Sequence, residues 1–108
     1  MPSTLYDKLV ASHAVAGLDA QNVLLYADLH IMNEYTSPQA FAGLHDAGRK
    51  VAVPGQQMSV VDHIIPTHPV RFRVIEDKPS ALQATNLARN CREHGIVLFD
   101  TNDTLQGI

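Results

Sequence analysis

Short apolar runs alternate along this chain with segments whose apolar residues recur at helical spacing, and no other feature narrows the fold as much. The runs cover residues 23–27, 58–65 and 96–99, and the helical segments cover 4–14, 37–48 and 79–94. A short apolar run suits a strand that is covered on both faces, as in a parallel sheet. The alternation therefore predicts an α/β fold, a three-layer α/β/α arrangement around a small, largely parallel sheet.

Capping signals mark the ends of the predicted helices. Thr4 and Asp7 have the spacing of a capping box at the start of the first helix. Ser37 is expected to cap the second helix while Pro38 occupies its first position, and Gly48 is expected to close it in a left-handed conformation. The third helix ends before Gly95 and presents one apolar face, formed by Ala81, Ala84, Leu87, Ala88 and Cys91.

The remaining segments are shorter or irregular. Residues 51–53 are interpreted as a short strand that Pro54-Gly55 stops. Residues 67–78 look irregular and hold most of the local positive charge, at Arg71, Arg73 and Lys78. Nothing in 106–108 resembles a closing helix or strand, and so few strands leave an edge that needs cover. The 108 residues fit one domain, and we expect 1–108 to be a single partial domain.

Composition excludes several classes of function. The net charge is −3 with neutral histidines and no like charges cluster, so nucleic-acid binding is not expected. No apolar stretch reaches the roughly 18 residues of a membrane span, and the N-terminus lacks the basic region of a secretory signal. A cytoplasmic location is the resulting expectation.

The single cysteine, Cys91, fits a reducing compartment and cannot form an intramolecular disulfide. An iron–sulfur cluster is usually held by three or four thiolates, so the chain alone cannot supply a thiolate-rich site. Because Cys91 lies on the apolar face of a predicted helix, it is expected to be a core thiol rather than a nucleophile.

Two Asp/His pairs stand where an open α/β sheet binds its ligands, at the carboxyl ends of strands. Asp62 and His63 interrupt an apolar run, and burying such groups without partners costs several kcal/mol. They are interpreted either as an oriented acid or base or as a strand end with a capping Asp and a satisfied core His.

Asp28 and His30 follow the run 23–27 and share one face of an extended strand. They form either a paired site or a solvent-exposed turn.

Other polar residues carry less information. Asn33 and Glu34 precede the Ser37 cap, where small polar residues are expected in any case. His63 and His68 are five apart, but no third ligand accompanies them, so no metal site is predicted. His13 and His45 are expected on helix surfaces, and His94 is a favourable charge at a helix C-terminus.

The order of these blocks resembles the N-terminal segment of the large subunit of 3-isopropylmalate dehydratase, in the aconitase superfamily. The matching blocks are 4–9, 24–30, 34–41, 48–51, 61–63, 66–67, 90–96, 99–100 and 106–108. They cover nearly the whole chain in order, and Thr36-Ser37-Pro38-Gln39-Ala40-Phe41 is the most specific of them.

The resemblance implies a stereospecific dehydration and rehydration of a hydroxy acid on a four-iron, four-sulfur (4Fe-4S) cluster, used in leucine biosynthesis. It implies His63 as the proton donor to the leaving hydroxyl and Asp62 as its electrostatic partner. It also implies substrate contacts from Asn33, His30 and Asp28, with a small-molecule carboxylate as the substrate.

Two departures bear on the substrate. The family's Asp-Arg-His is Asp28-Leu29-His30 here, which removes a guanidinium able to bind a carboxylate at two points. A His-Glu dipeptide is Asn33-Glu34, which removes an imidazole. Both departures leave two alternatives open. The chain belongs either to an enzyme that acts on another small di- or tricarboxylate or to a paralogue without activity.

The resemblance also implies partners. The family's cluster cysteines, its further catalytic segments and its separate small, swivelling subunit have no counterpart here, and Cys91 matches a helix cysteine that is not a cluster ligand. We expect the chain to supply part of an active site, to bind no cluster alone, and to need the remainder of the large subunit and the small subunit. The alternatives are a catalytically inactive stand-alone binding or regulatory module, or an unrelated α/β protein with a chance match.

Overall fold

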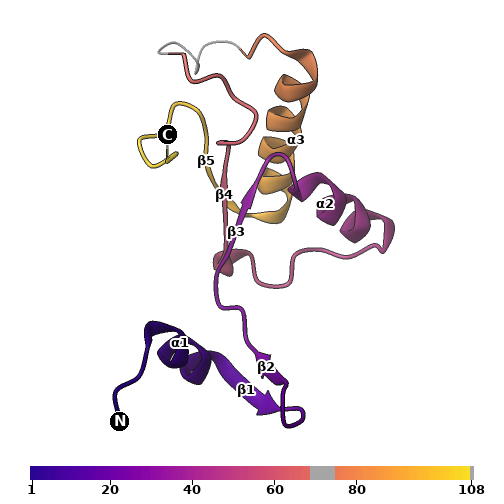
Figure 1. The fold of residues 1–108 in the computed structure, drawn as a ribbon. Helices are drawn as coiled ribbons and strands as arrows, with labels where there is room; N and C mark the ends of the chain where they lie inside the picture. Colours follow the sequence, from indigo (N-terminus) through magenta and orange to yellow (C-terminus); the bar gives the residue numbers. More distant parts are fainter. Residues whose placement is uncertain (69–74, 108) are drawn as a thin grey trace.

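A computed structural model describes residues 1–68 and 75–107 (Figure 1). The elements in chain order are α1 (Leu5–His13), β1 (Ala14–Gly17), β2 (Val23–Leu25), β3 (His30–Asn33), α2 (Ser37–Asp46), the 3-10 helix η1 (Pro54–Gln56), β4 (Gln57–Val60), α3 (Lys78–His94) and β5 (Val97–Phe99). Arg71 and Arg73, expected in an irregular connection, lie outside the described residues, as does Ile108.

Strands β3, β4 and β5 form a parallel sheet with β4 in the middle. Its register aligns Asn33 with Val60 and Val60 with Phe99, so all three strands end at the same edge. Helices α2 and α3 connect successive strands, contact each other and lie on the same side of the sheet (Figure 1). The predicted α/β class with a small, largely parallel sheet is confirmed, and the described residues supply one layer of helices.

The run 23–27 folds differently from the prediction of a covered parallel strand. Only β2 forms there, and it pairs antiparallel with β1 as a hairpin whose apolar side chains are exposed. The Asp19 carboxylate accepts hydrogen bonds from the backbone N–H groups of Gln21 and Asn22 at 2.8 and 2.9 Å, which stabilises the connecting loop. An apolar run of this length does not reveal which partner it pairs with, and β1 went unrecognised because it follows α1 directly.

The core lies between the sheet and the two helices. Its buried side chains are Met32, Phe41, Val61, Leu87, Cys91 and Ile96. Alternation along β4 turns Ser59 toward α3, where the Cys91 thiol donates to the Ser59 hydroxyl at 3.3 Å. Cys91 is therefore the core thiol that the sequence predicts, and burial raises the pKa of that thiol.

Local signals account for most of the helix ends. The capping box of α1 is present: Thr4 Oγ1 accepts from the Asp7 N–H at 3.1 Å, and the Asp7 carboxylate accepts from the Thr4 N–H at 2.9 Å. Gly48 and Gly95 adopt positive φ values of 64° and 70° after α2 and α3, as a left-handed helix end requires.

Two local predictions are wrong. Ser37 is the first residue of α2 rather than its cap, because Thr36 takes the cap position, and the buried Ser37 hydroxyl has no hydrogen-bond partner. Residues 51–53 form no strand; the Val51 N–H donates instead to His94 Nδ1 at 3.2 Å.

No helix in the described part of the chain is long and apolar enough to cross a membrane.

Candidate functional site

The carboxyl edge of the parallel sheet brings together side chains that are distant in the sequence. Glu34 directly follows β3, and Asp62 and His63 follow β4 after one residue, Val61. Because Asn33 pairs with Val60 in register, Glu34 and the 61–63 segment leave the sheet side by side. The Val61 N–H donates to the Phe99 carbonyl at 3.2 Å and keeps this segment against β5.

Glu34 lies at the centre of this arrangement and is 0% exposed. Its carboxylate accepts three consecutive backbone N–H groups: Oε2 from Asp62 at 3.1 Å, and Oε1 from His63 and Ile64 at 2.6 Å each. Hydrogen bonds to a charged acceptor are among the strong ones, and they satisfy a group that is otherwise costly to bury. Sequence reasoning missed this role, because β3 itself was not predicted and Glu34 was interpreted as an ordinary residue near a helix cap.

Asp62 and His63 form the hydrogen-bonded pair that the sequence singles out. His63 Nδ1 lies 2.5 Å from Asp62 Oδ1, and the two side chains are 51% and 30% exposed. The hydrogen bond that His63 Nδ1 donates to the Asp62 carboxylate raises the pKa of His63 above its usual value; burial opposes this, and the charges of Asp62 and Glu34 add to it. With Nδ1 engaged, Nε2 is the ring nitrogen that can meet a ligand.

Gln106 approaches the same segment from the end of the chain. It is 2% exposed, and its Nε2 donates to the Val61 carbonyl, the last acceptor before Asp62. The other amide atom, Oε1, is buried without a hydrogen-bond partner. No local pattern in 100–107 indicates this contact, because its partner lies 45 residues upstream.

Asn33, predicted to contact substrate, lies at the same edge. Its Oδ1 accepts hydrogen bonds from the Tyr35 N–H at 2.9 Å and from the Thr36 N–H at 3.0 Å, which shape the turn between β3 and α2. The carbonyl oxygen of Asn33 is therefore engaged locally, and substrate contact by this residue stays a prediction.

Asp28 and His30 lie elsewhere, because they precede or begin β3 rather than follow a strand of the parallel sheet. His30 pairs with Gln57, the first residue of β4, which places it at the amino edge. Its Nδ1 donates to Gln57 Oε1 at 2.7 Å. Asp28 contacts His13 Nε2 at 2.9 Å rather than His30. The structure thus separates both residues from Asp62 and His63 by the length of a strand.

The cluster of Glu34, Asp62 and His63 has the composition of a metal site, with donor atoms within 4.8 Å of one another. However, both Glu34 oxygens accept backbone N–H groups, and His63 Nδ1 is bonded to Asp62. These ligand atoms are already satisfied within the protein, so the geometry favours an oriented acid–base pair over a metal centre.

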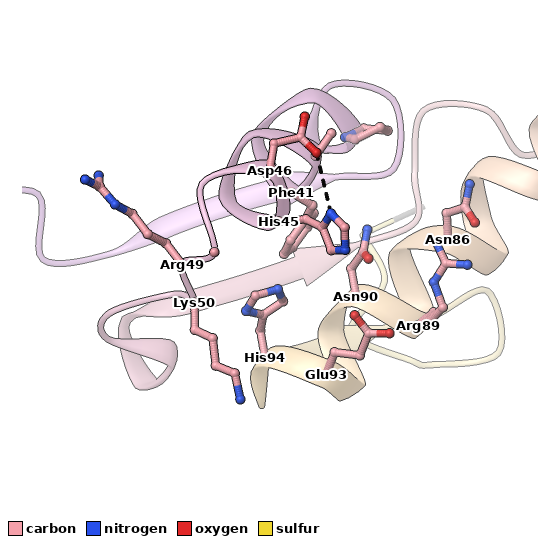
Figure 2. Close-up of a pocket in the computed structure, with 13 residues that line it drawn as sticks. Phe41, His45, Asp46, Arg49, Lys50, Asn86, Arg89, Asn90, Glu93 and His94 are labelled. Carbon is pink, nitrogen blue, oxygen red and sulfur yellow. Dashed lines mark hydrogen bonds and ion pairs between the residues drawn. The ribbon is translucent and has the colours of Figure 1, made fainter.

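A groove of about 810 Å³ lies between α2 and α3 (Figure 2). Its lining includes Phe41, Arg49, Lys50, Arg89 and His94, and excludes Asp62 and His63. In Figure 2 the cationic side chains point to different sides of the groove rather than toward one centre. The Phe41 and His94 rings lie 5.3 Å apart, and His94 Nδ1 accepts the Val51 N–H, so part of this wall is structural.

A carboxylate–imidazole pair at the carboxyl edge of a parallel sheet is an arrangement suited to acid–base chemistry on a small α/β scaffold. A model of the aconitase family (aconitate hydratase) matches residues 7–108, and the chain belongs to that family. The family assignment confirms the resemblance at the level of the aconitase superfamily of hydro-lyases. No solved structure matches the chain.

Members of this family generally bind a 4Fe-4S cluster, so the thiols of the chain are the groups to test against one. Cys91 is the single cysteine, and it is 2% exposed between α3 and the sheet, bonded to Ser59. Burial also raises the pKa of this thiol, whereas a cluster ligand must be a thiolate. The residues of this chain therefore do not fit a cluster ligand set.

Proposed function

We propose that the chain forms part of the active site of a hydro-lyase that dehydrates and rehydrates a hydroxy di- or tricarboxylic acid, such as 3-isopropylmalate in leucine biosynthesis. The observation that supports this proposal is the Asp62–His63 pair, with Nδ1 bonded to the carboxylate and the imidazole half exposed. Membership of the aconitase family supports the hydro-lyase class.

In the proposed reaction, His63 acts as the general acid. The protonated imidazole donates its Nε2 proton to the departing hydroxyl as the C–O bond breaks, and the product is water and an alkene. A base takes the proton from the neighbouring carbon, and we assign that base to no residue of this chain. Asp62 holds Nδ1 and stabilises the imidazolium, whose raised pKa keeps more of it protonated near neutral pH. Rehydration is the reverse.

We further propose that the cluster is held by thiolates other than Cys91, and that the remainder of the large subunit and a small, swivelling subunit complete the site. The support is the burial of Cys91 together with the exposure of the sheet face opposite the helices, where Ile31 is 64% and Val97 is 54% exposed. Exposed apolar surface on a sheet is typical of a face that packs against further protein, and it supports this part of the proposal.

The substrate can differ from 3-isopropylmalate. Leu29 is 50% exposed and stands where the family has an arginine, so a two-point carboxylate contact is absent from that position. Among the predicted contact residues, Asn33 lies at the edge that carries His63, and Asp28 and His30 lie at the opposite edge. We therefore favour Asn33 over the other two as a substrate contact.

His63→Ala tests the assignment in the natural protein. We expect turnover to fall by about 10²- to 10⁴-fold, the usual contribution of a general acid, with the iron signal of the cluster unchanged. The rate is followed by the absorbance of the unsaturated acid. His45→Ala, on the exposed surface of α2, is the control and should retain activity. Wild-type turnover in His63→Ala would refute the role.

A second candidate function is a catalytically inactive binding or regulatory module. The specific observation in its favour is Leu29, which replaces a cationic substrate contact of the family. The two proposals differ in the wild-type protein: the hydro-lyase turns over a hydroxy di- or tricarboxylate, and the inactive module binds one without releasing the unsaturated acid.

A further inference from the structure

Two buried polar side chains hold the backbone around Asp62 and His63 from opposite sides. We propose that Glu34 and Gln106 are positioning residues for this pair: Glu34 fixes the N–H groups of 62–64, and Gln106 fixes the carbonyl that precedes them. The inference rests on the proposed function, because it assigns how the acid of that site is held.

The geometry of Glu34 requires a carboxylate. Three consecutive N–H groups converge on its two oxygens at 2.6 to 3.1 Å, and the side chain has no exposed surface. A carboxylate is an acceptor at both oxygens, whereas a glutamine would turn an NH₂ group toward one of these donors. With a glutamine at position 34, the three N–H groups have no other acceptor that could replace the carboxylate. The segment lies beyond the end of β4, so the strand ladder supplies none.

Gln106 completes the arrangement on the other side of the segment. Its amide donates to the Val61 carbonyl, while the Val61 side chain is itself fully buried in the core. The carbonyl of Val61 and the N–H groups of 62–64 are thus held by side chains that come from two distant parts of the chain. The Asp62 and His63 side chains, in contrast, are partly exposed. The backbone is fixed and the reactive groups face outward, which is how a preorganised site is built.

Glu34 differs from Gln106 in one respect that an experiment can use. Glu34 carries a negative charge close to His63. Among the described residues, Asp62 and Glu34 are the two whose charges raise the pKa of this imidazole. Gln106 is neutral. Removing either side chain releases the backbone, but only the loss of Glu34 also changes the electrostatic surroundings of His63.

The test uses Glu34→Gln and Gln106→Leu in the natural protein. We expect roughly 10- to 100-fold lower kcat in both, with KM little changed, because a displaced acid loses alignment while substrate binding remains. Hydrogen exchange at the amides of 62–64 should accelerate in both variants. In Glu34→Gln the pKa of His63, followed by NMR of labelled histidine, should fall; in Gln106→Leu it should stay at the wild-type value.

Matched controls are available on the exposed helix surfaces. Glu93→Gln on α3 and Gln39→Leu on α2 make the same chemical changes at exposed positions and should leave kcat, amide exchange and the pKa of His63 unchanged. If Glu34→Gln does not fold, Glu34→Asp, which keeps the charge and shortens the reach, should lower kcat with a smaller change in that pKa.

A folded Glu34→Gln variant with wild-type kcat and wild-type amide exchange would overturn the inference for Glu34, and the same result in Gln106→Leu would overturn it for Gln106. Failure of the proposed function has a different signature. If His63→Ala keeps wild-type turnover, the acid assignment is lost, while amide exchange at 62–64 and the His63 titration still decide whether these two residues hold the pair.

Discussion

The proton on His63 depends on the carboxylate beside it. Asp62 raises the pKa of His63, so the acid form persists to higher pH than in a free imidazole. We predict that Asp62→Asn returns this pKa toward 6.5 and shifts the basic limb of the kcat/KM profile to lower pH, with the largest loss of rate on the alkaline side. Asp46→Asn, beside the exposed His45, is the control and should leave the profile unchanged. An unshifted limb in Asp62→Asn would argue against the pairing.

A second histidine makes stability depend on pH. His13 Nδ1 faces the Leu9 carbonyl at 2.8 Å and Nε2 faces Asp28 at 2.9 Å, and these contacts, the Leu9 bond first, raise the pKa of His13. A raised folded-state pKa contributes stability that is complete below the unfolded value near 6.5 and is lost as pH rises through the folded value. We predict that His13→Gln lowers the unfolding free energy of the part formed by α1 and the β1–β2 hairpin more at pH 5.5 than at pH 9. Circular dichroism during urea unfolding measures this difference. Equal effects at both pH values would contradict this.

Helix α3 contributes Leu87 and Cys91 to the buried core. Leu87 is 1% exposed and packs in the cluster with Cys91 and Ile96, whereas Leu82, five residues earlier on the same helix, is 60% exposed. We predict that Leu87→Ala lowers the free energy of unfolding by about 2–5 kcal/mol through lost burial and a residual cavity. Leu82→Ala should change it by less than about 0.5 kcal/mol. Chemical denaturation of both variants measures the difference, and similar values would contradict the packing.

The elements also show which parts of the fold the sequence can predict. Helices α1 and α3 follow from local signals, a capping box at Thr4 and a left-handed glycine at Gly95, so their bounds are predictable within a residue or two. Strand pairing is non-local: β2 has the composition of a covered strand but pairs in an exposed hairpin, and β3 does not stand out because only two of its four residues, Ile31 and Met32, are apolar. The residues of the candidate site also differ in whether local sequence signals or distant contacts reveal them. Asp62 and His63 are visible as an interruption of an apolar run, while Glu34 and Gln106 act through contacts 28 and 45 residues away.

The whole molecule is extended for its length. Its radius of gyration is 17.5 Å, compared with about 13 Å for a compact domain of 100 residues, and its extents are 52 × 38 × 22 Å. Figure 1 shows why: α1 and the β1–β2 hairpin lie apart from the parallel sheet. The Tyr26 hydroxyl, which follows the hairpin, donates a hydrogen bond to Gln56 Oε1 beside the parallel sheet at 2.7 Å. A shape of this kind leaves much apolar surface in contact with water.

The sheet itself provides a specific test of that exposure. Alternation turns Met32, Ser59 and Leu98 toward the helices, so the aligned row Ile31, Met58 and Val97 faces away from them. Ile31 and Val97 are more than half exposed, and no described helix covers this face. We predict that the 108-residue chain increases the fluorescence of an apolar dye, and that Ile31→Thr with Val97→Thr, which preserves strand propensity, lowers this signal.

Leu105→Thr is the matched control for this measurement, because Leu105 is 70% exposed but lies outside the sheet. It should leave most of the dye fluorescence in place. If the double variant and the control reduce the signal equally, the dye is not reporting the sheet face. If the wild-type chain gives no signal, the face is covered in solution, and the need for further protein against it disappears. The expected order, a wild-type signal that falls more in the double variant than in the control, would support the proposal that further protein packs against this face of the sheet.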